Sequence, residues 1–493
     1  MSLSATNGKS DLTSKTINGI FWSYLSFIVG KGLSFLSTII LARLLLPEQF
    51  GVMGYCLIFI QYLDIINSAG IDGALISCRE NLQEAANAAF IGNIALGCLT
   101  FVITWMAAPS VANFFNEPEV IPALRVLALS LPISGLGLVP DALIQRGLRF
   151  KTKLFPDISR NLSKGLVSIL LALLGFGVWS LIWGQIISAL TGSLLCWLLA
   201  GWKPTWRFNR EAIRSIMAFG FNIILLEFAG AFRDNVDYLL VGRILGAAAL
   251  GYYTMAFRIP ELLISSLNSV IGRVSFPALA AMQVEKEKMR SFYYSYIRYL
   301  SVFVFPVGIG LALTAPVFIP TFLSSQWDSA IVPTSLIAVA LAISAIGYVP
   351  GVLYKAIGRP EILNLLGLIK IPIAVAVLWY STRWGIIGVA AGHIFVGMFS
   401  VALDTLVANW IMQYQLRHLI TAILPGLGSS IVMGLSLVAL NKLFTMNGLW
   451  GLLIMVMVGI SVYFVTLLLT GRSTVIQGLV VLRQIMARPE KVA

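Results

Sequence analysis

Long hydrophobic segments, separated by short polar stretches, follow one another along the whole chain. A transmembrane helix needs about 20 predominantly apolar residues, and fourteen segments of this kind can be placed in the sequence. Their approximate bounds are 17–45, 51–77, 87–108, 120–145, 156–175, 178–200, 213–244, 251–278, 294–316, 330–353, 361–380, 385–411, 420–440 and 449–470. The alternating strands of an outer-membrane barrel are absent. The pattern predicts an all-α polytopic membrane protein with about 14 transmembrane helices, with twelve as the alternative count.

A repeat with an offset near two hundred residues runs through this hydrophobic pattern. LARLLLPEQFGVMGY at 41–55 matches VGRILGAAALGYYTM at 241–255, with one Arg and one Gly at the same spacing in each. The further matches, at offsets up to 211, are Val139-Pro140 with Val349-Pro350, Gly147 with Gly358, and GVWSLIWGQ from Gly177 with GIIGVAAGH from Gly385. Two similar membrane halves in the same order are typical of transporters, whose substrate path lies at the junction of the halves.

The repeat also predicts the domain organisation. The sixth hydrophobic segment ends at GWKPTWRFNR, a Trp-rich and basic interfacial stretch that we interpret as the joint between the halves. We therefore expect an N-terminal lobe of spans one to six over residues 1–205 and a C-terminal lobe of spans seven to twelve over 206–415. Residues 416–493 are expected to form a final helix pair and a cytoplasmic tail.

Lys and Arg in the predicted loops are distributed very unevenly. Twenty-one of them lie on the even-numbered loops and the termini, against two, Arg383 and Lys442, on the opposite loops. Adding Arg43 and Arg243, at the ends of their spans, raises the smaller number only to four. Because positive residues stay on the cytoplasmic side, both termini are predicted to be cytoplasmic, as in a multi-pass protein of the bacterial inner membrane.

Composition narrows the function classes. The chain of 493 residues is 58% hydrophobic and 11% charged, whereas a soluble protein carries roughly 25% charged residues. The net charge of +13 follows from the loop bias and suits an anionic inner leaflet, so no nucleic-acid partner is expected. Four cysteines without CxxC spacing, two histidines and the absence of a Walker motif predict no metal site, no cofactor and no ATP hydrolysis by that route.

Ionisable residues inside the spans are the strongest functional signal, because each is costly unless it is hydrated or paired. The basic candidates are Lys31 in the first span, Arg160 and Lys164 in the fifth, Arg233 in the seventh and Arg258 in the eighth. The acidic candidates are Asp64 and Asp72 in the second span and Glu227, Asp234 and Asp237 in the seventh. We interpret Lys31, Asp64, Glu227 and Asp234 as lining a hydrated central cavity, since they lie deep and have no obvious partner in sequence.

Simpler interpretations apply to the other intramembrane charges. Asp157 with Arg160, and Arg233 with Asp237, have the spacing of local ion pairs that merely permit insertion. Side chains near span ends are expected to extend to the interface; they are Arg43, Arg243, Arg273 and Asp404.

The order of several motifs resembles a known family. NGIFWSYLSF followed by IILARLLLPEQFG, then YLDIINSAGIDGALI, GRILGAAALGYYTMAFRIP and SFPALA are similar to Wzx-type polysaccharide flippases. Within the multidrug/oligosaccharidyl-lipid/polysaccharide exporter superfamily, the likeness is to the colanic-acid and exopolysaccharide exporter branch. The resemblance covers nearly the whole chain and implies two pseudo-symmetric six-helix lobes facing each other in a V.

The resemblance implies a substrate and a mechanism. The substrate would be an undecaprenyl-diphosphate-linked oligosaccharide repeat unit, moved to the periplasmic leaflet by alternating access. Cationic cavity residues would hold the diphosphate, with Lys31, Arg233 and Arg258 matched by position and Arg160 and Lys164 as additional ligands. Protonation or cation binding at Asp64, Asp72, Glu227, Asp234 or Asp237 would reset the carrier, if coupling exists. Membrane lipids, a polysaccharide polymerase and its co-polymerase are the other candidate partners.

Three alternatives follow from the same sequence. A multidrug antiporter of the superfamily would prefer an acidic cavity, whereas this one has a basic share. A flippase for a lipid-linked peptidoglycan precursor would share the fourteen-span plan and differ only in substrate. A polytopic enzyme such as a polymerase or ligase would need a sizeable outer loop with catalytic Arg or His. Since no such loop is present, no catalytic residues and no enzymatic activity are expected.

Overall fold

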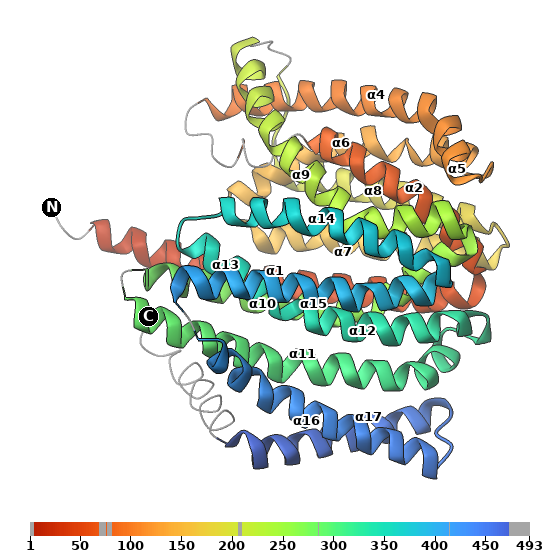
Figure 1. Ribbon diagram of the computed structural model, residues 1–493. Coiled ribbons are helices and arrows are strands. Elements are labelled where there is room, and N and C mark those ends of the chain that lie inside the picture. The colour runs from red at the N-terminus through yellow and green to blue at the C-terminus, as the bar shows by residue number, and fades with distance from the viewer. Residues whose placement is uncertain are drawn as a thin grey trace. The chain divides into compact units, whose positions relative to one another are not determined.

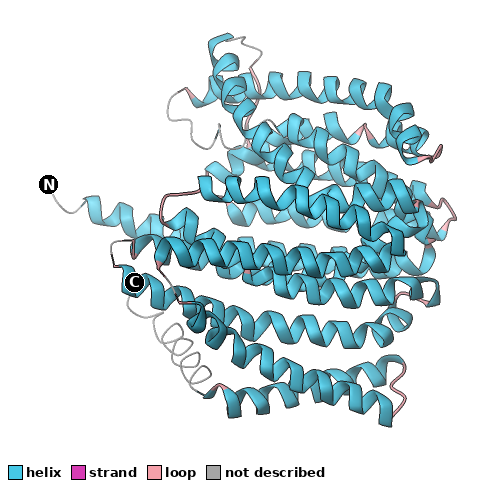
Figure 2. Ribbon diagram, in the orientation of Figure 1, coloured by secondary structure: helices cyan, strands magenta, loops and turns pink. Residues whose placement is uncertain are grey.

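The computed structural model describes residues 4–68, 75, 81–205, 210–283, 285–413 and 415–472. Throughout these residues the secondary structure is helical, with short connecting loops and no strand (Figure 2). The helices of the first half are α1 (Ser4–Leu44), α2 (Pro47–Ser68), α4 (Leu82–Phe115), α5 (Val120–Leu127), α6 (Ser130–Arg146), α7 (Phe150–Leu173), α8 (Val178–Ala200) and α9 (Arg210–Leu245). Those of the second half are α10 (Ala247–Ala281), α11 (Lys286–Phe322), α12 (Ile331–Ile346), α13 (Tyr348–Ala356), α14 (Glu361–Ser381), α15 (Gly385–Met412), α16 (Leu416–Leu443) and α17 (Gly448–Thr470), with short 3₁₀ turns at Ser325–Ala330 and Thr382–Trp384.

The described helices give fourteen membrane-spanning passes. The pair α5 and α6 forms one interrupted pass, Val120–Arg146, and α12 and α13 together form another, within Ser325–Ala356. Ten stretches are long and apolar enough to cross a membrane, and one of these covers both α14 and α15. The long helices α7, α9 and α10, which carry most of the intramembrane charges, complete the fourteen. The prediction of an all-α protein with about fourteen transmembrane helices is therefore confirmed.

Helix packing divides the chain into two compact units, residues 1–251 and 252–493. In the N-terminal unit, α7 packs against α1 and α8, α6 packs against α4 and α8, and α9 packs against α2 and α4. The packing thus places the seventh transmembrane helix with the first six. The predicted lobe boundaries at residues 205 and 415 are derived from the sequence repeat. Helix packing does not test them, so they stay a prediction.

The C-terminal unit is organised around α11. This helix packs against α12, α16 and α17, and α15 packs against α12 and α14 (Figure 1). Its buried aromatic residues include Tyr293 and Tyr354, both fully buried. The final helix pair is fixed by a hydrogen bond that Tyr463 Oη donates to the carbonyl oxygen of Val302 at 2.6 Å. Apolar side chains on the outside, such as Trp410 at 82% exposure, are typical of surfaces that face lipid.

Equivalent small residues pack equivalent helices in the two units. Gly97 of α4 lies against Pro132 of α6, and Gly308 of α11 lies against Ala342 of α12. The corresponding positions differ by 211 and 210 residues, within the range of the sequence repeat. One more equivalent contact joins Gly137 to Ser193 in the first unit and Gly347 to Val401 in the second. The repeat in sequence is therefore also a repeat in helix packing.

Candidate functional site

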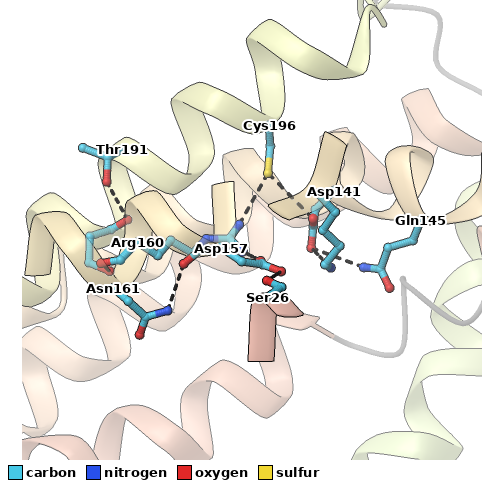
Figure 3. Close-up of polar contacts among 10 residues, drawn as sticks. Ser26, Asp141, Gln145, Asp157, Arg160, Asn161, Thr191 and Cys196 are labelled. Carbon is cyan, nitrogen blue, oxygen red and sulfur yellow. Dashed lines mark hydrogen bonds and ion pairs between the residues drawn. The ribbon is translucent and has the colours of Figure 1, made fainter. Parts of the chain in front are cut away.

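A network of charged and polar side chains from α1, α6, α7 and α8 lies inside the N-terminal unit (Figure 3). In α7, Arg160 Nη1 lies 3.3 Å from Asp157 Oδ1, and Ser26 of α1 donates to the other oxygen of Asp157 at 3.2 Å. Also in α7, Lys153 Nζ lies 2.9 Å from Asp141 Oδ2 of α6. We call Ser26, Asp141, Lys153, Asp157, Arg160 and Cys196 the polar node.

Cys196 of α8 connects the two ion pairs of the polar node. Arg160 Nη2 donates to Cys196 Sγ at 3.5 Å, and the thiol donates to Asp141 Oδ1 at 3.8 Å. Gln145 donates to the same aspartate at 3.3 Å (Figure 3). Because two acidic and two basic groups balance, the node has no net charge, which is how ionised groups are accommodated among apolar helices.

The sequence of α8 makes room for Arg160. A Cβ at Gly192 would lie 2.2 Å from Arg160 Nε, so the guanidinium stem occupies space that only glycine leaves open. Ser188 Oγ donates to the Arg160 carbonyl oxygen at 2.9 Å, and Ser163 and Thr191 are joined by a hydrogen bond of 2.8 Å. The close packing of α7 on α8 therefore fixes the side chain of Arg160 against Cys196.

The contacts in the polar node answer one question that the sequence left open, whether Asp157 and Arg160 form a local ion pair. Asp157 and Arg160 do form a local ion pair, with side chains 29% and 33% exposed. Four members of the node, Ser26, Asp141, Lys153 and Cys196, are not among the candidates from the sequence. Lys153 precedes the predicted segment 156–175, whereas α7 begins at Phe150 and includes it. Asp141 lies within the predicted segment 120–145, and a carboxylate inside a span is a signal that could have indicated the node.

A second group of candidates lies where α9 packs on α2. Tyr62 Oη donates to the Ala231 carbonyl oxygen at 3.5 Å, and its ring lies 4.9 Å from that of Phe228. Arg233 pairs with its neighbour Asp234 at 2.8 Å, and both side chains are about 60% exposed. In the same helix Asp237 is 4% exposed.

The other candidates are distributed over both units. Lys31 is exposed on α1 with Nζ 5.8 Å from the centre of the Phe27 ring, and Asp64 and Glu227 are exposed on α2 and α9. Arg258 is exposed on α10, in the C-terminal unit, and Lys164 is half-buried on α7. Asp72 lies outside the described residues.

The C-terminal unit contains a buried ion pair that the sequence analysis missed. Lys370 Nζ of α14 lies 2.8 and 3.0 Å from the two carboxylate oxygens of Asp404 in α15. The expectation that Asp404 extends to the interface is wrong, because the residue is 5% exposed and neutralised by Lys370. Tyr354 Oη also donates to the Asp404 carbonyl oxygen at 2.6 Å.

The two ion-pair sites occupy equivalent places in the repeat. Lys370 follows Arg160 by 210 residues, and Asp404 follows Cys196 by 208. A cation from the fifth pass of each half therefore reaches the same position on the sixth. In the C-terminal unit that position is itself a carboxylate, whereas in the N-terminal unit it is a thiol and the carboxylates come from Asp141 and Asp157. Among the described residues, no group of three or more His, Cys, Asp or Glu side chains forms a metal site.

Two carboxylates, Glu117 and Glu119, lie outside the membrane-spanning helices, between α4 and α5, and Glu48 in the first turn of α2 is close enough to act on Glu117. Partial burial raises the pKa of Glu117, and the nearby charges of Glu119 and Glu48 raise it further. A carboxyl group with a raised pKa binds its proton more tightly in the folded protein than in the unfolded chain. It therefore lowers the free energy of unfolding as pH rises above the usual pKa of 4.5.

Replacing Glu117 by glutamine is expected to raise the melting temperature at pH 7 slightly. The gain should correspond to a few tenths of a kcal/mol, because the site is largely screened by water. It should disappear as the pH falls to 4.5, where the wild-type carboxyl is protonated as well. Thermal unfolding of the purified protein between pH 4.5 and pH 7 measures this. Equal melting temperatures of the two proteins over the whole range would contradict the argument.

Comparison with known proteins gives consistent matches. The model of a family described as "Polysaccharide biosynthesis protein" matches residues 40–332, more than half of the chain. The lipopolysaccharide biosynthesis protein WzxC of Escherichia coli (strain K12) is 26% identical over 80% of this chain and 80% of its own length. The succinoglycan biosynthesis transport protein ExoT of Rhizobium meliloti (strain 1021) is 28% identical over 67% of each chain. The lipid II flippase MurJ, in an inward closed conformation, superposes with a TM-score of 0.72 and 15% identity, covering 93% of this chain and 100% of that one.

Proposed function

Because the chain belongs to the polysaccharide biosynthesis protein family, we propose that it is a flippase for lipid-linked oligosaccharides in polysaccharide assembly. The observation that carries the proposal is the family match over residues 40–332 on a chain of fourteen membrane passes. The transport function in the name of ExoT and the repeated helix packing support it. The substrate is an oligosaccharide repeat unit on undecaprenyl diphosphate, which moves from the cytoplasmic to the periplasmic leaflet.

The chemistry of the substrate explains why a flippase needs polar groups in membrane helices. A diphosphate and several sugars cannot cross the apolar core of a bilayer unaided, whereas the lipid tail is soluble in that core. Lys31 and Arg258 bind the diphosphate by charge-assisted hydrogen bonds. Both side chains are exposed on the surfaces of α1 and α10, which is what a ligand-binding cation requires. Lys164 and Arg233 are secondary cations of the same path.

The topology follows from the loop charges. Both termini face the cytoplasm, and the protein lies in the bacterial inner membrane, with the starts of α2 and α10 on the outer side. The acidic residues Asp64, Glu227, Asp234 and Asp237 are the groups through which a proton or another cation would drive the return step. The partners are the lipid-linked glycan, membrane lipids, and a polymerase with its co-polymerase.

Deleting the gene in its host tests the proposal. Extracellular polysaccharide should be lost, while repeat units of normal length accumulate on undecaprenyl diphosphate in the membrane. Wild-type protein should restore export. Lys31→Ala or Arg258→Ala should lower export about tenfold or more, the effect of losing one hydrogen bond to a charged group. Lys442→Ala is the matched control, because this lysine is exposed in the last turn of α16, in the C-terminal unit.

Other outcomes would support the alternative functions. Unchanged polysaccharide with altered sensitivity to cationic drugs would indicate a multidrug antiporter. Accumulation of a lipid-linked peptidoglycan precursor, with a defect in growth, would indicate a flippase of that substrate. Equal export by the Lys31→Ala, Arg258→Ala and Lys442→Ala proteins would show that Lys31 and Arg258 do not bind the diphosphate. The proposed flippase activity would not be affected by that result.

A further inference from the structure

The first turns of α2 and α10 touch through a reciprocal pair of glycine contacts, all within the N-terminal unit. A Cβ at Gly51 would lie 1.9 Å from the carbonyl oxygen of Ala247, and a Cβ at Gly251 would lie 1.9 Å from that of Pro47. Cβ atoms do not approach other atoms this closely, and the neighbours here are backbone atoms, which cannot rotate away. Only glycine therefore permits this contact at positions 51 and 251.

The sequence repeat exchanges the two contacts. Pro47 and Ala247 are 200 residues apart, as are Gly51 and Gly251, so each contact is the copy of the other. Small residues allow the backbones of membrane helices to meet, and the glycine hydrogen that replaces Cβ points at the opposite carbonyl oxygen, as in a weak Cα–H···O bond. Separation of the starts of α2 and α10 would break both contacts at once.

The next turn of α2, which contains Tyr55 and Cys56, is closely packed. Tyr55 is fully buried, its Oη donates to the Gly242 carbonyl oxygen at 2.9 Å, and its ring stacks on Phe115 with centroids 4.1 Å apart. The neighbouring thiol of Cys56 is also fully buried. The glycine contacts thus stand directly outside a closed layer of side chains.

We propose that the contacts of Gly51 with Ala247 and of Gly251 with Pro47 are the outer gate of the transport path. The inference rests on the proposed function and on its topology, which places the starts of α2 and α10 on the outer side. The gate is closed in this structure. Opening it separates α2 from α10, and closing it requires that positions 51 and 251 carry no side chain.

The native thiol of Cys56 reports on the gate. In a protein whose other three cysteines are replaced, with serine at position 196, a membrane-impermeant maleimide is added from the outer side. Gly51→Ala or Gly251→Ala should raise the labelling rate about 5- to 150-fold, which corresponds to about 1–3 kcal/mol of overpacking in the closed state. Both should also lower export. Gly92→Ala and Gly32→Ala are the matched controls, because a Cβ at either position meets no atom within 4 Å.

A measurement on the unsubstituted gate covers the case in which the alanine variants fail to fold. Labelling of Cys56 should increase when the host synthesises the lipid-linked glycan and fall when glycan synthesis is blocked, because turnover visits the open state. Cys56 that stays unreactive during turnover, or Gly51→Ala protein that folds, labels slowly and exports normally, would overturn the gate. Loss of the flippase function appears separately, as unchanged polysaccharide in the deletion strain.

Discussion

Lys370→Ala is expected to lower the free energy of unfolding by about 3–5 kcal/mol, the cost of breaking a buried ion pair by removing one partner. The residue left behind, Asp404, is 5% exposed and loses both of its hydrogen bonds from Lys370. A carboxylate cannot remain ionised there without a partner. The purified protein should melt at a lower temperature, and its yield in membranes should fall.

Two further variants identify the cause. Lys355→Ala removes an exposed lysine from the same unit and should change stability by less than about 0.5 kcal/mol. Replacing Lys370 and Asp404 together by leucine should recover most of the loss, because no unpaired charge remains and apolar residues can replace a buried pair. A Lys370→Ala protein that melts with the wild type, or a double variant worse than the single one, would show that the pair does not stabilise α14 against α15.

The fold could be predicted because its determinants lie close together in sequence. An apolar run of about 20 residues is sufficient to indicate a transmembrane helix, and the repeat follows directly from aligned motifs such as those at Gly51 and Gly251. Charged helices were harder. Segment 156–175 carries several charges, and the structure shows how α7 accommodates two of them, since Asp157 and Arg160 neutralise each other.

The side-chain partners could not be predicted in the same way. Lys370 and Asp404 are 34 residues apart, and nothing in either helix alone indicates that they meet. Whether the two side chains meet depends on how each helix is rotated about its own axis. The apolar pattern of a membrane helix indicates this rotation poorly, because the faces toward lipid and toward protein are both apolar. The repeat contained the missing information. Aligning Arg160 with Lys370 and Cys196 with Asp404 would have marked the pair once the first contact was known.

The same limit applied to the proposed substrate cations. Arg160 and Lys31 are both basic candidates inside predicted spans, and the structure distinguishes them. Arg160 is held between Asp157 and Cys196, whereas Lys31 is exposed on α1 beside Phe27. The exposed lysine has donors to offer a diphosphate, and the arginine already uses its donors to stabilise the polar node. We therefore rank Lys31 above Arg160 as a ligand.

Arg160→Ala is expected to lower the free energy of unfolding by about 1–3 kcal/mol, less than for a fully buried pair, and to reduce export in proportion to the protein that is lost. Without the guanidinium, the polar node keeps Asp141 and Asp157 against Lys153 alone, so one half-buried negative charge is uncompensated. Thermal unfolding and export per folded molecule should be measured together, with Gly32→Ala, a change into open space on α1, as the control.

Exchanging the two charges distinguishes a structural role from substrate binding. In the double variant Asp157→Arg with Arg160→Asp, the node is neutral again, but its guanidinium is displaced by three residues along α7. If Arg160 only balances the node, as its contacts indicate, the exchange should recover most of both stability and export. Recovery of stability without export would instead assign Arg160 to the diphosphate, because a bound ligand requires the cation at its original place whereas a neutral node does not.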